Sequence, residues 1–145
     1  MTLSSQLLDE AVRAHGHLGP FLVIGLRTGL LGKRLCNGEV QECRVETIGV
    51  KPPLCAVDGI KAAIGQATLS VKPSPGICAI FTATSGNRVA VRVKAEVLER
   101  YRSVAWERCE EAAGEVLRSV GEDLFKWLPK PRPTSKSSSG KERFT

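Results

Sequence analysis

Apolar residues recur at helical spacing in two consecutive segments near the N-terminus. The apolar positions of the first segment share one face, which predicts a helix that begins at Ser4 or Ser5 and ends near Ala14. The second segment, from Pro20 to about Arg34, is apolar on most sides. Pro20 suits the first position of a helix, where its missing N–H has no intrahelical partner to lose. We therefore expect two helices joined by a sharp corner.

The second predicted helix carries a stripe of glycines, Gly25, Gly29 and Gly32. Glycine weakens a helix, so a stripe of it indicates that another backbone approaches closely. Tight packing of this helix on a sheet is the first interpretation. A contact between two copies of the chain is the second, and we expect a homodimer.

Alternating apolar and polar residues predict strands in the middle of the chain. The predicted strands are Val40–Ile48, Ala67–Lys72, Gly76–Thr84 and Arg88–Ala95, with a helix at Leu54–Gly65 between the first two. Cys43, Val45 and Thr47 share one face of the first strand, and Val89, Val91 and Val93 share the inward face of the last.

A long apolar stripe follows, and it predicts a helix from about Glu96 to Val120. The apolar segment at residues 124–128 is expected to dock back on the core. The order of elements predicts an α+β fold with helices packed on one face of a mixed four-stranded sheet. We expect one domain at residues 1–128 and a disordered basic tail at residues 129–145.

The positive charge of the chain is concentrated at its C-terminal end. The formal net charge is +6, but residues 126–145 hold six basic residues and one acid, which leaves +1 for residues 1–125. The folded part is therefore not expected to attract nucleic acid or a membrane. Loose, salt-dependent RNA binding by the tail is the third-ranked function.

The five cysteines are odd in number and show no paired spacing. A secreted disulfide framework is thus not expected, and a cytoplasmic location is. No signal peptide is recognised, and the apolar stretch at residues 21–31 is too short to span a bilayer. We place Cys36 in an exposed turn, interpret Cys43, Cys78 and Cys109 as core residues, and interpret Trp106 and Trp127 as packing residues.

Two histidines provide the first candidate chemistry. His15 and His17, the only histidines, flank Gly16 in the corner between the first two helices. In an extended corner both rings can turn toward one point, and imidazole is the commonest metal ligand. A short His-x-His sequence is also common in ordinary solvent-facing loops.

Cys55 lies at a predicted helix start, where the helix dipole and free N–H groups favour a thiolate. Asp58, three residues later, is a ligand, an acceptor that orients a histidine, or an ordinary helix-start carboxylate. A buried, inert Cys55 is the alternative interpretation. Arg27 is a charge within an apolar helix and needs a partner, such as Asp58 or a bound anion, unless it extends to solvent.

The segment AHGHLGPFLVIGLRTG at residues 14–29 resembles the N-terminal signature of FmdE, a family of formylmethanofuran dehydrogenase subunits. PPLCAVDGI at residues 52–60 resembles that family's Cys-x-x-Asp helix start. The resemblance implies an α+β domain in which both motifs meet and bind a metal, commonly zinc. It implies His15, His17 and Cys55 as ligands, with Asp58 and Arg27 lining the site.

The chain departs from the family pattern in its thiols. Many members carry a cysteine where this chain has Ala67, some carry one where it has Gly19, and longer members have a cysteine-rich C-terminal module that is absent here. Two imidazoles and one thiolate leave an open position on zinc or another divalent transition metal. Alternatively, Asp58 closes the site, or the site has decayed.

Three functions follow from these residues and motifs. The first is a zinc-binding domain with an auxiliary or small-molecule role related to one-carbon and formylmethanofuran metabolism, with its catalytic status open. The second is a non-catalytic interaction component of a larger oxidoreductase complex, in which the metal site is structural or lost. RNA binding by the tail is the third.

Overall fold

The computed structural model describes residues 3–128, so the predicted tail at residues 129–145 lies outside the described part. The helices are α1 (Ser5–His15), α2 (Pro20–Leu35), α3 (Ala56–Ile64), α4 (Ala95–Arg102), α5 (Cys109–Arg118) and α6 (Gly121–Leu124), with 3-10 turns η1 (Pro53–Cys55) and η2 (Trp106–Arg108). The strands are β1 (Val40–Thr47), β2 (Thr68–Pro73), β3 (Cys78–Ala83), β4 (Arg88–Val93) and β5 (Phe125–Leu128).

The strands form one mixed sheet in the order β2-β1-β3-β4-β5. β1 and β2 are parallel, and the other neighbours are antiparallel. The α+β class and the mixed sheet are confirmed, but the sheet has five strands and the predicted four is wrong. The extra strand is the C-terminal apolar segment, which docks by pairing with β4, Phe125 opposite Val93. Four residues are too few for alternation to reveal a strand.

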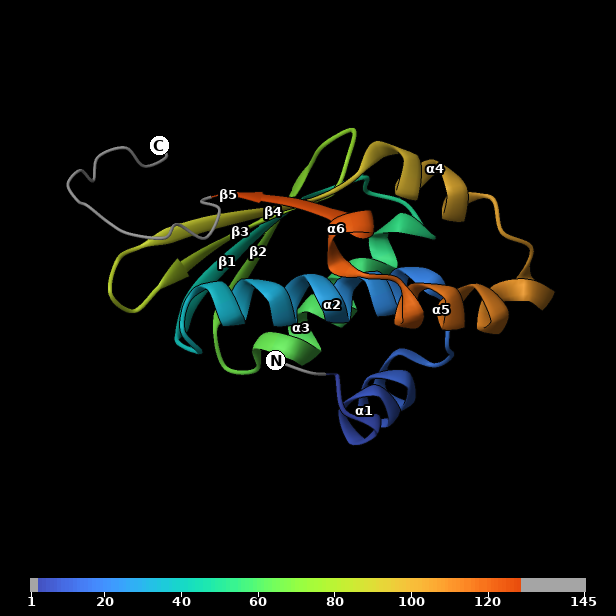
Figure 1. Cartoon of the computed structure of the whole chain (residues 1–145), viewed down its shortest axis with the longest axis horizontal. Coiled ribbons are helices and arrows are strands. Elements are labelled where there is room, and N and C mark those ends of the chain that lie inside the picture. The colour runs from blue at the N-terminus through green and yellow to red at the C-terminus, as the bar shows by residue number, and fades with distance from the viewer. Residues whose placement is uncertain (1–2, 129–145) are drawn as a thin grey trace.

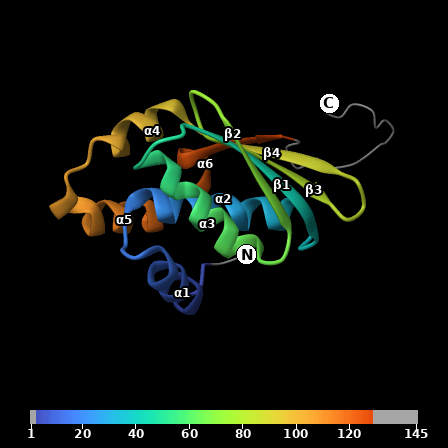
Figure 2. The same cartoon turned by 180° about the vertical axis from the view of Figure 1, so that it is seen from behind.

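One face of the sheet is buried beneath the helices. Cys43, Val45 and Thr47 of β1 are buried, as are all three predicted inward valines of β4. The two views of the chain show α2 and α3 along this face and α1 on the outer side of the helices (Figures 1 and 2). The predicted faces of β1 and β4 are therefore confirmed.

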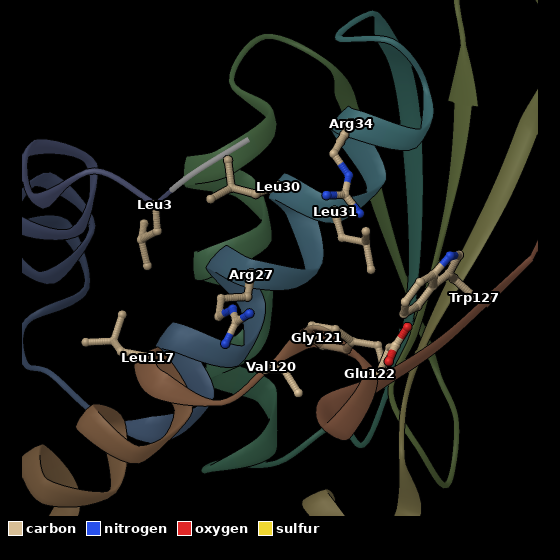
Figure 3. Close-up of a pocket in the computed structure, with 11 residues that line it drawn as sticks. Leu3, Arg27, Leu30, Leu31, Arg34, Leu117, Val120, Gly121, Glu122 and Trp127 are labelled. Atoms are coloured by element: carbon tan, nitrogen blue, oxygen red, sulfur yellow. The ribbon is translucent and has the colours of Figure 1, made fainter. Parts of the chain in front are cut away.

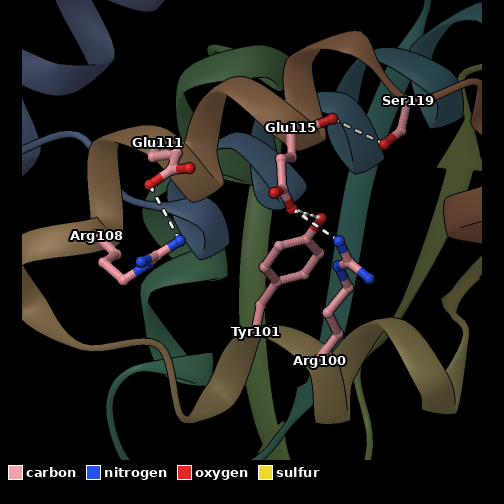
Figure 4. A network of polar contacts seen from close by, with 6 residues as sticks. All are labelled: Arg100, Tyr101, Arg108, Glu111, Glu115 and Ser119. Carbon is pink, nitrogen blue, oxygen red and sulfur yellow. Dashed lines mark hydrogen bonds and ion pairs between the residues drawn. The ribbon is translucent and has the colours of Figure 1, made fainter.

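The predicted long helix after β4 is wrong. The chain breaks between α4 and α5, and the two helices fold back on each other (Figure 4). Tyr101 Oη donates to Glu115 Oε1 at 3.0 Å, and Arg100 Nη2 donates to the same oxygen at 3.2 Å. No glycine or proline marks the break, and apolar spacing continues across it, so the pattern alone could not reveal two helices.

The glycine stripe of α2 is used inside the domain. A Cβ on Gly25 would overlap the carbonyl oxygen of Ala56, and one on Gly29 would lie 2.6 Å from Ala63 Cβ. Gly32 faces the ring of Phe81 on β3. Tight packing is thus the correct interpretation, although α3 is the partner of Gly25 and Gly29 and the sheet is the partner of Gly32.

Three cysteines belong to the core. Cys43 and Cys78 are buried, as predicted, but Cys36 is only 5% exposed, so its placement in an exposed turn is wrong. Its side chain packs into the main core at the end of α2. Burial, together with neighbouring Cys36 and Cys78, raises the pKa of Cys43 to about 12. Within residues 3–128, no helix has the length and apolar character needed to cross a membrane.

Gly25→Ala should destabilise the fold by about 3 kcal/mol, because the new methyl group would overlap the backbone of Ala56. Urea unfolding monitored by circular dichroism measures this change. Gly49→Ala is the matched control: no atom lies within 4 Å of its Cβ position, so its effect should stay within about 0.5 kcal/mol. Equal stability of the two variants would contradict the close approach of α2 and α3.

Cys43 should resist alkylation by iodoacetamide in the folded protein near pH 8, because its thiol is buried and its raised pKa keeps it protonated. In urea the same thiol should react completely. Peptide mass spectrometry of native and unfolded samples measures both states. Rapid native labelling of Cys43 would show that the sheet does not bury this face.

Candidate functional site

The histidine corner depends on the backbone of Gly16. This residue has φ = 115°, in the left-handed region, and its N–H donates to the Val12 carbonyl at 2.8 Å, which ends α1. His15 is therefore the last residue of α1, and His17 lies in the loop beyond it. The two ring centroids are 5.4 Å apart, so the predicted corner does bring the imidazoles close together.

His15 is oriented by Asp58, which lies in the first turn of α3. Nδ1 of the imidazole is 2.7 Å from Oδ2 of the carboxylate, and the His15 side chain is only 6% exposed. An ionised carboxylate only accepts hydrogen bonds, so this contact keeps the proton on Nδ1 and leaves the Nε2 lone pair free. Of the three roles open to Asp58, this geometry favours that of an orienting acceptor.

Cys55 is half-buried in η1, immediately before α3. Burial raises the pKa of its thiol, as do Asp58 and Cys109, whereas Lys51 lowers it. Cys55 therefore lies within electrostatic reach of the carboxylate that holds His15. It is neither a fully buried core residue nor a freely exposed thiol.

His17 contacts a segment that no sequence motif connects with the site. Its ring centroid is 4.5 Å from that of Trp106 in η2. Trp106 is 70% exposed, so its interpretation as a packing residue is wrong. Cys109 begins α5 and is half-buried, which also differs from its predicted core position. Only the break before η2, had it been recognised, would have indicated either residue.

Three helices begin at this end of the domain. The N-terminal ends of α2, α3 and α5 lie at the same end in both views of the chain, next to the corner that follows α1 (Figures 1 and 2). Helix N-termini carry positive partial charge and favour nearby anions such as thiolates. The surroundings of Cys55 and Cys109 thus partly offset the unfavourable effect of burial on an ionised sulfur.

The spacing of the two imidazoles fits a shared metal ion. With Zn–N bonds of about 2.1 Å and tetrahedral angles, two ligating rings have centroids about 5 Å apart, and the observed separation is 5.4 Å. Within residues 3–128, however, no three His, Cys, Asp or Glu side chains are grouped closely enough to hold a metal. The two rings and the orienting carboxylate are together, and the third ligand is not in place.

Arg27 lies apart from this cluster. Its Nη1 donates to the carbonyl of Val116 at 2.7 Å and to that of Ser119, at the end of α5. It lines a cavity of about 550 Å³ that also includes Arg34 and Trp127 (Figure 3). A cation at the C-terminal end of a helix is favourable, so α5 provides the partner that this charge needs.

The geometry described above lies within a recognised family. Residues 14–133 match the family model described as FmdE, molybdenum formylmethanofuran dehydrogenase operon, and this range contains both the histidine corner and Cys55. No curated protein matches the chain. Because the match covers most of the sequence, this chain belongs to the FmdE family.

Proposed function

We propose that this FmdE-family domain binds one transition-metal ion, zinc in the first instance, through His15 Nε2, His17 and Cys55. The observation that carries the proposal is the contact of 2.7 Å between His15 Nδ1 and Asp58 Oδ2. A carboxylate that fixes the outer nitrogen of a histidine is the usual support of a metal-ligating imidazole. The second imidazole, at 5.4 Å between centroids, is the natural companion ligand.

Each residue has a distinct role in the proposed centre. Asp58 holds the His15 ring in the tautomer whose Nε2 can bind a metal. His17 is loop-borne and half-buried, so rotation about its side-chain bonds can aim it at the same point. Cys55 supplies the thiolate, and its proton leaves to solvent on binding, as metal coordination requires.

The proposed biological role is auxiliary or small-molecule chemistry related to one-carbon metabolism. The family description names the formylmethanofuran dehydrogenase operon, and the proposed ligands match a borderline-soft ion such as zinc. Bound zinc can polarise a carbonyl group or acidify water. The residues of this chain provide the orientation and the charge balance on which either use depends.

Untagged wild-type protein, dialysed against zinc and then against buffer, should retain one zinc per chain. His17→Ala and Cys55→Ala should each retain much less, because each removes a ligand. Inductively coupled plasma mass spectrometry measures the ratio. Cys78→Ala removes a buried thiol of the sheet and should keep full occupancy. A wild-type protein that retains no transition metal after supplementation would refute the proposed function.

Asp58→Asn should weaken zinc binding by about 10- to 100-fold without changing the stoichiometry at saturation, because His15 loses its orienting carboxylate. Competition with a chromophoric chelator measures the affinity. Asp9→Asn, at an exposed position of α1, is the matched control. Unchanged affinity in Asp58→Asn would mean that Asp58 serves only the start of α3.

A further inference from the structure

Cys109 is the one half-buried thiol that the proposed ligand set leaves unused. It begins α5, immediately after the turn that carries Trp106. Its Sγ donates only a long contact, 3.7 Å, to the carbonyl of Ala105. The sulfur is therefore weakly held, at the end of the domain where the histidine corner lies.

The position of Gly19 relates Cys109 to His17. A Cβ placed on Gly19 would lie 3.0 Å from His17 Cε1 and 4.0 Å from Cys109 Cβ. The histidine ring and the base of the cysteine side chain thus surround a single point beside the loop. A thiol on α5 can reach the space that a side chain at position 19 would occupy.

Cys109 also lies near the second thiol of the site. Its charge raises the pKa of Cys55, as does the charge of Asp58, and Asp58 contacts His15. Neighbouring pairs therefore connect His15, His17, Cys109, Cys55 and Asp58 in a closed ring. The members come from the α1–α2 corner, the start of α3 and the start of α5.

We propose that Cys109 Sγ is the fourth metal ligand, which completes a centre of two imidazoles and two thiolates. This inference rests on the proposed metal-binding function. Both thiols release their protons to solvent when their sulfurs bind. A tetrahedral site with four protein ligands is closed, whereas catalytic zinc sites keep one position for water or substrate.

Closure of the site would decide between the two proposed roles. With Cys109 bound, the ion has no open position, which favours an auxiliary or structural role over hydrolytic chemistry. The second thiolate also favours zinc over harder ions such as magnesium. The absence of cysteine at positions 19 and 67 would then be compensated, in part, from α5.

Cobalt(II) substitution tests the assignment, because sulfur-to-cobalt charge-transfer absorption near the ultraviolet increases with the number of bound thiolates. Wild-type protein, reduced and kept under argon, is titrated with cobalt chloride alongside Cys55→Ala, Cys109→Ala and Cys109→Ser. Each single variant should lose about half of the band per bound cobalt, and the Cys55→Ala/Cys109→Ala double variant should lose it entirely. Circular dichroism checks that every variant is folded, and the near-isosteric serine keeps the test usable if alanine disrupts α5.

The outcomes separate this inference from the proposed function. If wild-type protein binds no cobalt or zinc, both fail. If it binds cobalt and folded Cys109→Ser keeps the full band, Cys109 is not a ligand, and the three-ligand proposal stands alone. A halved band in both Cys109 variants supports the fourth ligand.

A rescue variant separates a ligand from a merely structural cysteine. Gly19→Cys in the Cys109→Ala chain should restore the lost half of the band, because position 19 faces the same point once the His17 ring yields slightly. Gly49→Cys is the matched control: it adds a thiol at a loop position with no neighbouring atom within 4 Å, and should restore nothing. If Gly19→Cys restores nothing in a folded chain, Cys109 acts through the fold, and its assignment as a ligand is overturned.

Discussion

The close approach of α2 and α3 is the constraint on which the rest of the domain depends. Gly25 meets the backbone of Ala56, and Gly59 meets the backbone of Leu22, so each helix provides a gap for the other. Both contacts lie near the N-terminal ends of the helices. The chain before α2 carries the histidines, and the chain at the start of α3 carries Cys55 and Asp58. Helix packing thus brings together two motifs that are about forty residues apart in the sequence.

Much of the fold could be predicted because its elements follow simple periodicities. The inward faces of β1 and β4 and the helices on either side of the corner were all evident from residue spacing. The α4–α5 break was not, because its cause is the long-range contact of Tyr101 with Glu115. β5 was recognised as a docking segment but not as a strand, since its pairing partner, β4, lies about thirty residues earlier.

The site was predictable in part for the same reason. His15, Asp58 and Cys55 lie within motifs whose local structure is clear, and the contact between His15 and Asp58 follows once α2 and α3 are packed. Cys109 and Trp106 depend on where α5 begins, which depends in turn on the hydrogen bonds that join α4 to α5. Arg27 shows the converse: its need for a partner was evident, but that partner is the end of α5, which no local pattern could indicate.

The attachment of α1 gives the site a thermodynamic consequence. Apart from His15, α1 rests on a small satellite cluster formed by Ala11 with Leu22, Leu26, Leu30 and Ala63, separate from the main core. Such peripheral elements open at lower free energy than the core. Any ligand that engages His15 only when α1 is docked must therefore favour the closed N-terminal segment by linkage, so occupancy of the site and protection of this helix from amide exchange would rise together.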